Sequence, residues 1–315
     1  MTKAASGCRG SGSSDHGFIV VAALWLLAAL AALASVASAY VAQSAVALTA
    51  LDAATQLEML TTAGVELTAY ELSAPVTVRR PTHGGFSLRL ANANVTVEYM
   101  SETARININM ASRTMIGGLF AALGAQPEAA GQFADRVVAW RSMPKPNVQD
   151  EEDELYRAAG LSYLPRRAPF NSVNELSLVL GLPAAMVERA LPFVTVYSGV
   201  AEINVLDAAP EVIAALPGMS PARLDAFLSQ RDSLPPDNPG FVLGALGGRQ
   251  VGATIAGSEA YRIRMRITLP NGRQSRPEAI IMILGPGEKQ AYRVFAWRQE
   301  IDSDTGGPQR AAENR

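Results

Sequence analysis

An apolar stretch without any charged side chain runs from Gly17 to Leu51, and Asp52 is the first charged residue after it. A helix of that length extends about 50 Å, at about 1.5 Å per residue. Its first part, Phe18–Tyr40, exceeds the roughly 20 apolar residues that a helix needs to cross a bilayer. The pattern therefore predicts a helix that spans a membrane and continues beyond it.

The helical pattern continues past the predicted span and then gives way to strands. From Gln43 to about Leu72 apolar residues recur at loosely helical spacing, and Pro75 ends the helix. From Val76 to Asn109 the period changes to two, since the segments TVRR, GFSLRLA, NVTVEYM and ARININ alternate β-branched or apolar residues with polar ones. We expect a small antiparallel meander in this region.

A helical period returns from Ala111 to about Ala256, with a weak internal repeat whose units begin at Ile108, Phe170 and Ile203. Each unit places Asn or Ser before an apolar helix, followed by a turn that contains Gly or Pro and by a second helix. Helix boundaries are marked by a capping box of Asn171 or Ser172 with Glu175, by Pro210 in a first turn and by Gly218 after a last turn.

Alternation resumes after Ala256 in three segments, EAYRIRMRITL, SRPEAIIMILG and QAYRVFAWRQE. The pair Asn271-Gly272 between the first two is the strongest short-range hairpin pattern in the chain. The turn Gly285-Pro286-Gly287 separates the last two. The simplest topology joins the strands on both sides of the helical block into one sheet. Such an insertion is tolerable because the cost of closing a loop grows slowly with its length.

Composition narrows the classes of function. The chain has 315 residues, a formal net charge of −2 and 49% hydrophobic residues, which permits a sizeable core and gives no basic surplus for nucleic acid. Cys8 is the one cysteine, and the two histidines are His16 in the polar head and His83 in a turn. Neither a Gly-x-Ser-x-Gly motif nor a Walker-type loop occurs. We find no catalytic constellation and predict that the protein is not an enzyme.

Two further segments are candidates for binding. The acidic run Asp150–Glu154 could attract a hard cation, but it lacks the spacing of an EF-hand, and a solvated loop is the expected structure. The turn Leu216–Ser220 resembles the helix-hairpin-helix turn that binds DNA phosphates, yet Ser220 replaces its second Gly and Arg223 is the only cation close behind it. Because counterion release supplies most of the affinity for DNA, we expect a packing unit here.

The polar head MTKAASGCRGSGSSDHG ends abruptly at Gly17, and Phe18 begins the apolar run. This junction resembles the leader of type IV prepilins, in which a dedicated peptidase cuts after the Gly and the new N-terminal Phe is methylated. One alternative is an ordinary signal anchor. Another is a lipoprotein box at Ala5–Cys8, although no apolar run precedes it.

Flanking charges predict the orientation of the apolar helix. Lys3 and Arg9 precede the span, and the positive-inside rule places such residues in the cytoplasm. The remainder of the chain then lies outside. The first charged residues after the span are all acidic, namely Asp52, Glu58, Glu66 and Glu71.

Taken in order, these segments resemble the K-type minor pseudopilins of the bacterial type II secretion system over essentially the whole chain. The resemblance is carried by the Gly17-Phe18 junction and by the segments ALWLLAALAALAS, ARININMA, FNSVNELSLVLGL and INVLDAAPEVIAALPGM. It implies an α+β fold in which a pilin-like N-terminal transmembrane helix packs on an antiparallel sheet, with a large all-α domain, helix-hairpin-helix or SAM-like, inserted between strands. The implied divisions are a leader (1–17), a transmembrane helix (18–40), its periplasmic continuation (41–75), a first part of the sheet (76–110), the all-α domain (111–256), a second part of the sheet (257–301) and a flexible tail (302–315).

Most pilins and pseudopilins carry Glu at the fifth position of the mature chain, whereas this chain has Ala22 there when Phe18 is counted as first. In a filament that Glu faces the N-terminal ammonium of the subunit ahead, in apolar surroundings where an unpaired charge costs several kcal/mol. A subunit with Ala22 cannot neutralise a subunit ahead of it, but it can offer its Phe18 amine to a Glu behind it. The resemblance therefore implies a subunit that starts or caps the pseudopilus. The alternative is that Ala22 merely preserves a transmembrane helix.

The resemblance also implies partners and a location. The partners are the minor pseudopilins I and J, the major pseudopilin G, the L- and M-type inner-membrane assembly platform and the prepilin peptidase, with no nucleic acid. The location is the inner membrane, with the C-terminal region in the periplasm. Calcium is a candidate cofactor by the same resemblance, but Trp140–Pro144 replaces the family's acidic, Gly-rich segment, and no ligands can be matched. Other readings are a type IV pilus minor pilin, a membrane-anchored DNA-uptake protein and a membrane-tethered enzyme.

Overall fold

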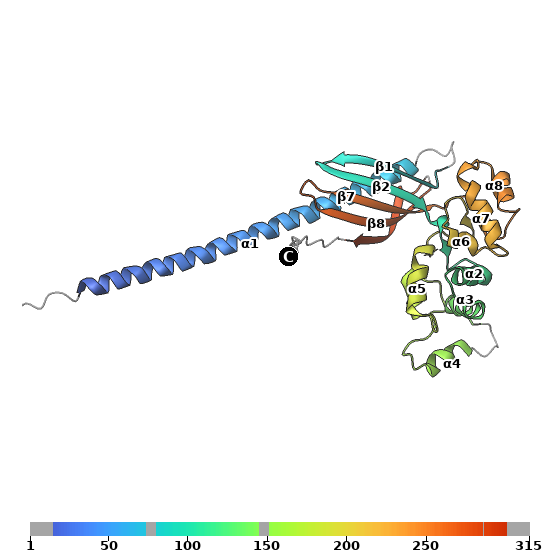
Figure 1. The fold of residues 1–315 in the computed structure, drawn as a ribbon, viewed down its shortest axis with the longest axis horizontal. Helices are drawn as coiled ribbons and strands as arrows, with labels where there is room; N and C mark the ends of the chain where they lie inside the picture. The colour runs from blue at the N-terminus through green and yellow to red at the C-terminus, as the bar shows by residue number, and fades with distance from the viewer. Residues whose placement is uncertain (1–14, 74–79, 145–150, 286, 301–315) are drawn as a thin grey trace, which may run out of the picture. The chain divides into compact units, whose positions relative to one another are not determined.

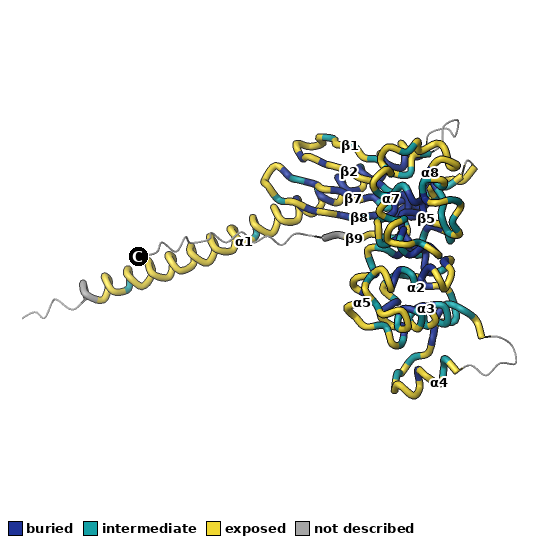
Figure 2. The backbone as a smooth tube through the Cα atoms, turned by 45° about the vertical axis from the view of Figure 1, so that its right-hand side comes forward, coloured by how far each residue is buried: buried dark blue, intermediate teal, exposed yellow. Residues whose placement is uncertain are grey.

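The computed structural model describes residues 15–73, 80–144, 151–285 and 287–300. The chain divides into two compact units, residues 1–59 and 60–315, and the first helix, α1 (Asp15–Leu72), runs through both (Figure 1). Its large apolar side chains between Phe18 and Leu51 are exposed, and Figure 2 colours most of this part of the tube yellow. The few hydroxyls in this stretch bond within the helix: Ser35 Oγ donates to the Ala31 carbonyl at 2.8 Å.

A five-stranded antiparallel sheet lies in the second unit, in the order β1-β2-β7-β8-β9. The predicted alternation places apolar residues on one face, since side chains of a strand point to alternate sides. Val95 and Val97 of β2 and Ile263 of β7 are buried on that face. The strands predicted on both sides of the helical block therefore do form one sheet. Their bounds are His83–Leu90 (β1), Ala93–Ser101 (β2), Ala260–Thr268 (β7), Gln274–Ile283 (β8) and Tyr292–Glu300 (β9).

The last turns of α1, Leu60–Leu72, pack on the apolar face of the sheet. Gly64 allows a close approach, because a Cβ at this position would lie 2.6 Å from the sulfur of Met265. At the end of the helix Tyr99 donates to Glu71 Oε1 at 2.8 Å, and Arg80 Nε donates to the Leu72 carbonyl at 2.8 Å. That arginine satisfies one of the carbonyls that a helix terminus leaves without an internal partner.

The helical block leaves the sheet after β2 and returns before β7, two strands that are hydrogen-bonded neighbours. The backbone N–H of Ser258 donates to Ser101 Oγ at 2.9 Å, so the two ends of the block are tied together. Its helices are α2 (Arg113–Ala122), α3 (Pro127–Arg141), α4 (Glu151–Ala158), α5 (Ala184–Ala190), α6 (Pro210–Ala214), α7 (Pro221–Gln230) and α8 (Pro239–Ala245).

One predicted strand of the meander is wrong. Within ARININ, Ile106–Asn107 forms the short strand β3, which pairs in parallel with β4 (Val194–Thr195) inside the helical block and not with the five-stranded sheet. The chain turns at once because Asn107 Oδ1 accepts the backbone N–H of Asn109 at 2.9 Å. The predicted strand segment TVRR lies mostly outside the described residues.

The weak repeat is visible as recurring local structure. The strand β3 lies directly before the first unit, and the third unit opens with β5 (Ile203–Asn204), which pairs in parallel with β6 (Ala253–Thr254). After each of these two strands an Asn side chain caps the turn, since Asn107 Oδ1 accepts the N–H of Asn109 and Asn204 Oδ1 accepts the N–H of Leu206 at 3.1 Å. In the second unit, the predicted capping residue Ser172 accepts the N–H of Asn174 at the start of a 3₁₀ helix, Val173–Leu178.

The acidic run is a helix where a solvated loop was expected. Residues Glu151–Ala158 form α4, whose Tyr156 is buried and accepts the backbone N–H of Leu180 at 2.8 Å. Acidic side chains in a first turn are favoured by the helix dipole. Arg136 donates to Glu152, and Arg167 donates to Asp153. Arginines from other segments therefore neutralise the negative charge of these two acids.

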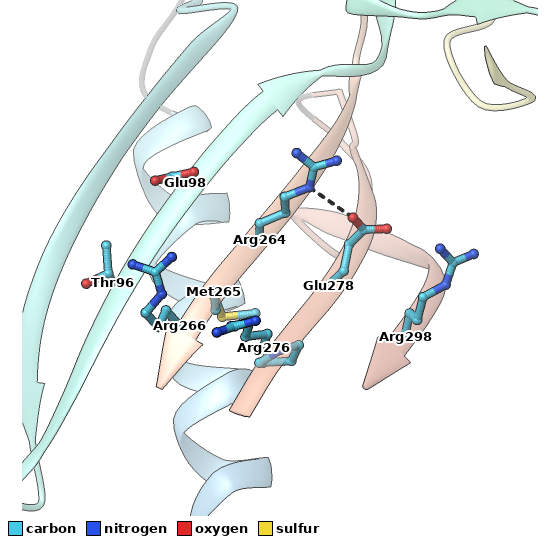
Figure 3. Close-up of a pocket in the computed structure, with 9 residues that line it drawn as sticks. Thr96, Glu98, Arg264, Met265, Arg266, Arg276, Glu278 and Arg298 are labelled. Carbon is cyan, nitrogen blue, oxygen red and sulfur yellow. Dashed lines mark hydrogen bonds and ion pairs between the residues drawn. The ribbon is translucent and has the colours of Figure 1, made fainter. Parts of the chain in front are cut away.

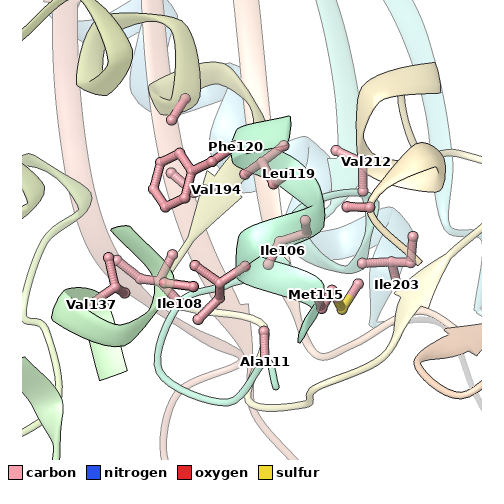
Figure 4. Close-up of a cluster of buried hydrophobic side chains, with 14 of the residues drawn as sticks. Ile106, Ile108, Ala111, Met115, Leu119, Phe120, Val137, Val194, Ile203 and Val212 are labelled. Carbon is pink, nitrogen blue, oxygen red and sulfur yellow. The ribbon is translucent and has the colours of Figure 1, made fainter. Parts of the chain in front are cut away.

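The helical block has its own hydrophobic core, built around β3 and α2 (Figure 4). Its close packing predicts the effect of one substitution. A Cβ on Gly118 would lie 2.5 Å from the carbonyl oxygen of Ala215, whereas one on Gly117 would make its nearest contact at 3.5 Å. We expect Gly118→Ala to lower the free energy of unfolding by about 1–3 kcal/mol, because a backbone atom must move. Thermal unfolding of the full chain in detergent measures this, and an equal effect of the control Gly117→Ala would contradict it.

Candidate functional site

The residues predicted to be processed or to assemble lie in the first two turns of α1. The helix begins at Asp15, so the Gly17-Phe18 junction lies within its first turn. Phe18 is 76% exposed, and Ala22 follows one turn later with a methyl group where an acid would be needed to pair with a neighbouring amine. The structure therefore brings Gly17, Phe18 and Ala22 together on one short stretch of helix, and their roles stay predictions.

The surface around these residues is apolar on all sides. Leu24, Trp25 and Leu33 are each more than half exposed, and they point in different directions around the helix. A helix that is apolar all round is stable only among lipid or other apolar helices. Within the described part of the chain, α1 is the one helix long and apolar enough to cross a membrane.

A buried ionic cluster joins the sheet to the helical block. Glu102 follows β2 directly, and its side chain is fully buried. Arg262 Nε donates to its Oε1 at 2.8 Å, Arg105 Nη1 donates to the same oxygen at 3.3 Å, and Thr195 Oγ1 donates to Oε2. Burial favours the neutral acid, but the hydrogen bond and charge of Arg262 outweigh it, so the pKa of Glu102 lies below its ordinary value.

This cluster fixes the helical block to the sheet through charge. Arg105 also donates to the carbonyl of Pro192 at 3.1 Å, and Arg262 Nη1 donates to Glu278 Oε1 at 2.8 Å. Burial and the neighbouring charge of Arg262 lower the pKa of Arg105 to about 10. Glu102 is not among the residues predicted from the sequence, and the pattern that could have identified it is an acid directly after a strand whose neighbouring strand carries alternating arginines.

His83 contacts a carboxylate that is distant in the sequence. Its Nδ1 lies 2.7 Å from Oδ1 of Asp207, a residue 124 positions away whose side chain is 1% exposed. Asn204 Nδ2 donates to the other carboxylate oxygen at 2.6 Å. The carboxylate of Asp207 is distant from His83 in the sequence, and the fold brings the two side chains together. The pair links the start of β1 to the turn before α6.

The turn that resembles a DNA-binding hairpin is occupied by contacts within the chain. Gly218 has a positive φ of 76°, and Ser220 Oγ accepts the N–H of Arg223 at 3.3 Å to cap α7. Arg223 Nη1 donates back to the Gly218 carbonyl at 3.4 Å. Arg223, the cation that follows this turn in the sequence, therefore folds over the turn itself, which agrees with a packing unit.

The described residues do not fit a calcium site. Among them, no group of three or more His, Cys, Asp or Glu side chains is placed to hold a metal ion. Two acids of α4 are engaged by arginines, and Asp150 lies outside the described residues. The segment Trp140–Pro144 supplies no acid either.

Part of the chain is similar to known proteins. Residues 89–199, from the end of β1 past β4, match the family model described as type II secretion system (T2SS), protein K. A 104-residue match that is 33% identical to type II secretion system protein K of Klebsiella pneumoniae covers 32% of each chain, so this chain spans about a third of that relative's length.

The fold is shared with a solved structure, the GspK-GspI-GspJ complex of the type 2 secretion system of enterotoxigenic Escherichia coli. The TM-score is 0.54 at 17% identity, and the match covers 78% of this chain and 96% of that one. The predicted α+β fold, with a long apolar helix, an antiparallel sheet and a helical block, is confirmed. The predicted family agrees with these matches, and over residues 89–199 the chain is similar to protein K of type II secretion systems.

Proposed function

We propose that this chain is a minor pseudopilin of a type II secretion system, a non-catalytic subunit that initiates or caps the tip of the periplasmic pseudopilus. The observation that carries the proposal is the protein K match across residues 89–199, in a chain that also has an exposed apolar helix of pilin type. The pseudopilus drives secretion of folded proteins, and this subunit contributes structure to it.

The mechanism follows from the first two turns of α1. Cleavage after Gly17 creates a new ammonium at Phe18, which is kept beside lipid or other apolar helices. An acid from the next subunit neutralises that ammonium, because leaving either charge unpaired in apolar surroundings costs several kcal/mol. Ala22 provides no acid for a subunit ahead. The subunit is therefore suited to the first position and to no later one.

The helical block supports the same position. It holds residues from the end of β2 to the start of β7, about half the length of the chain, and it is fastened to the sheet at Ser101, Glu102 and Asp207. Neighbouring subunits of a helical shaft leave little space for an added domain of this size. At a tip, one side of the subunit is open and accommodates it.

The proposed surroundings follow from the apolar helix and the solved complex. We place α1 in the inner membrane as a single span, with the N-terminus in the cytoplasm and the sheet and helical block in the periplasm. The solved structure that shares this fold is a complex of GspK, GspI and GspJ. We propose the corresponding I- and J-type minor pseudopilins as partners here, followed by the major pseudopilin G, the assembly platform and the prepilin peptidase.

A complementation experiment tests the proposal. In a strain that carries this chain and its secretion system, deleting the chain is expected to leave secreted proteins folded in the periplasm, and re-expression restores export. Tagged chain, extracted in mild detergent, is expected to co-purify the I- and J-type pseudopilins. Normal export in the deletion strain, together with the absence of both partners, would remove the proposed role.

A further inference from the structure

The two edge strands of the five-stranded sheet, β9 and β1, differ in how they are protected (Figure 1). The pairing of β9 with β8 has a register shift between Ile280 and Ile281, and the ring of Tyr197 from the helical block stacks on Phe295 with ring centroids 5.4 Å apart. Bulges and covering segments hinder the pairing of a strand edge with another chain. By contrast, β1 pairs with β2 along its whole length without a register shift. The edge at β1 is therefore the less protected of the two.

Half of the backbone groups of β1 point away from the sheet. The N–H of Ser101 donates to the carbonyl of Thr82 at 2.7 Å, directly before the first residue of β1 and in the same register, so these two residues form a hydrogen-bonded pair. Hydrogen-bonded and non-hydrogen-bonded pairs alternate along an antiparallel ladder. The N–H and C=O groups that face the free edge therefore belong to His83, Gly85, Ser87 and Arg89.

These backbone groups are open from Gly85 to Arg89. Among the residues that the structure describes, no backbone hydrogen bond from another segment reaches this side of the strand. The side chain of Ser87 does not shield its own backbone, because its Oγ donates to Thr96 Oγ1 of β2 at 3.4 Å. A row of unpaired N–H and C=O groups is a template for an extended segment of another chain.

The two faces of β1 define the side chains that an added strand must present. Phe86 and Leu88 are half-buried on the face that packs on α1, and Leu90 is 44% exposed on the same face. The opposite face is polar, since Thr96 and Glu98 of the neighbouring strand β2 line a cavity of about 400 Å³ there (Figure 3). An added strand therefore needs apolar residues on the first face and polar residues on the second, as in other antiparallel sheets with one solvated face.

Arg89 favours a negative charge on the added strand. Its side chain is exposed, and its register partner on β2 is the uncharged Asn94. Within the described part of the chain, Arg89 has no ion pair with a carboxylate. Opposite charges that face each other on neighbouring strands stabilise a sheet, so an acid on the added strand has a partner at this position.

We propose that the free edge of β1 receives an extended strand of a neighbouring pilin-type subunit, with apolar residues on the side of α1 and an acid opposite Arg89. Main-chain hydrogen bonds supply the affinity, and the side chains of Phe86, Leu88 and Arg89 set the register. The proposal rests on the proposed function, which supplies the I- and J-type pseudopilins as neighbours. A subunit confined to the first position has no second copy beside it, so the strand comes from another type of subunit.

Ser87→Pro tests the proposal without removing a bond to β2. The N–H of Ser87 points to the free edge, and proline lacks that donor and is tolerated on an edge strand. The tagged full chain is extracted in mild detergent from a strain with an active secretion system. Ser87→Pro is expected to retain about tenfold less of the I- or J-type partner than the matched control Ser87→Ala, which keeps the N–H. Arg89→Gln is expected to retain about threefold less than wild type.

A photo-crosslinking amino acid locates the contact in cells and does not depend on the proline variant. In place of Ser87 it is expected to link the chain to an I- or J-type pseudopilin, and in place of Arg293 on β9 to give at least tenfold less of that product. Equal retention of partners by Ser87→Pro and Ser87→Ala, or equal crosslinking from both edges, would overturn the role of β1 and leave the proposed function intact. Crosslinks from position 87 that join only two copies of this chain would overturn it too.

The wild-type chain separates the two levels of the proposal. Absence of both partners from wild type would contradict the proposed function and, with it, the docking of a strand on β1. Retention by wild type with loss in Ser87→Pro supports both. Thermal unfolding of each variant shows that it is folded.

Discussion

Replacing Glu102 by Gln is expected to lower the free energy of unfolding of the second unit by about 3–5 kcal/mol. The substitution leaves the guanidinium groups of Arg105 and Arg262 buried without their shared carboxylate, and breaking a buried ion pair on one side costs about that much. For a unit of this size, at about 2–4 °C per kcal/mol, the melting temperature falls by roughly 6–20 °C. Thermal unfolding of the full chain in detergent, followed through the fluorescence of buried Trp140, measures the change.

An exposed ion pair provides the control for that experiment. Arg113 and Asp135 bond through side chains that are 57% and 56% exposed. Surface pairs contribute about 0–1 kcal/mol, so Asp135→Asn is expected to change the melting temperature little. A similar loss in both variants would show that the buried cluster has no special role at the junction.

The same cluster predicts how stability depends on pH. The pKa of Glu102 is lowered in the folded protein, so the unfolded chain binds its proton more readily. The stabilisation from Glu102 is therefore fully present above the ordinary pKa of about 4.3 and is lost as the pH falls below it. Wild type is expected to lose stability more steeply than Glu102→Gln between about pH 4.5 and pH 3. Parallel curves for the two proteins would contradict the assignment.

Ala22→Glu is expected to impair secretion by about tenfold, equivalent to about 1.4 kcal/mol in assembly. The new acid could neutralise the ammonium of a subunit ahead, so the variant would no longer be confined to the first position, where its helical block is accommodated. Export of a secreted protein into the medium, measured against its periplasmic pool, gives the readout. Membrane levels and the processed N-terminus are checked for each variant.

Two controls separate this effect from the cost of a charge in lipid. Ala23→Glu carries the same charge one residue along, about 100° around the helix, and has the same insertion penalty of about 3 kcal/mol. Ala22→Gln has a similar size and no charge. We expect both controls to secrete more than Ala22→Glu, and equal secretion by Ala22→Glu and Ala23→Glu would contradict the pairing role of position 22.

Local patterns in the sequence were sufficient to predict most of the fold. The alternation in β7, β8 and β9 follows from side chains that face a core and a surface in turn, and the Asn271-Gly272 turn connects two of these strands as expected. The long apolar helix and the insertion between β2 and β7 were predicted on the same basis.

The parts that were not predicted depend on contacts between distant residues. Glu102 pairs with Arg262, 160 positions away, and His83 with Asp207, 124 positions away. A periodic pattern of neighbouring residues cannot predict such pairs. The acidic run became a helix because Tyr156 is buried and arginines from other segments neutralise its acids. Pro277 lies in an alternating segment that predicts an ordinary strand, and only the structure shows that the hydrogen-bonded ladder between β7 and β8 is interrupted there.

The central claim is that Phe18 becomes the N-terminus of a processed subunit without an acid at position 22. Mass spectrometry of the chain purified from a strain with an active secretion system tests it most directly. The account predicts a mature N-terminus at methylated Phe18, with residues 1–17 absent. An intact Met1 in a cell that secretes normally would contradict it.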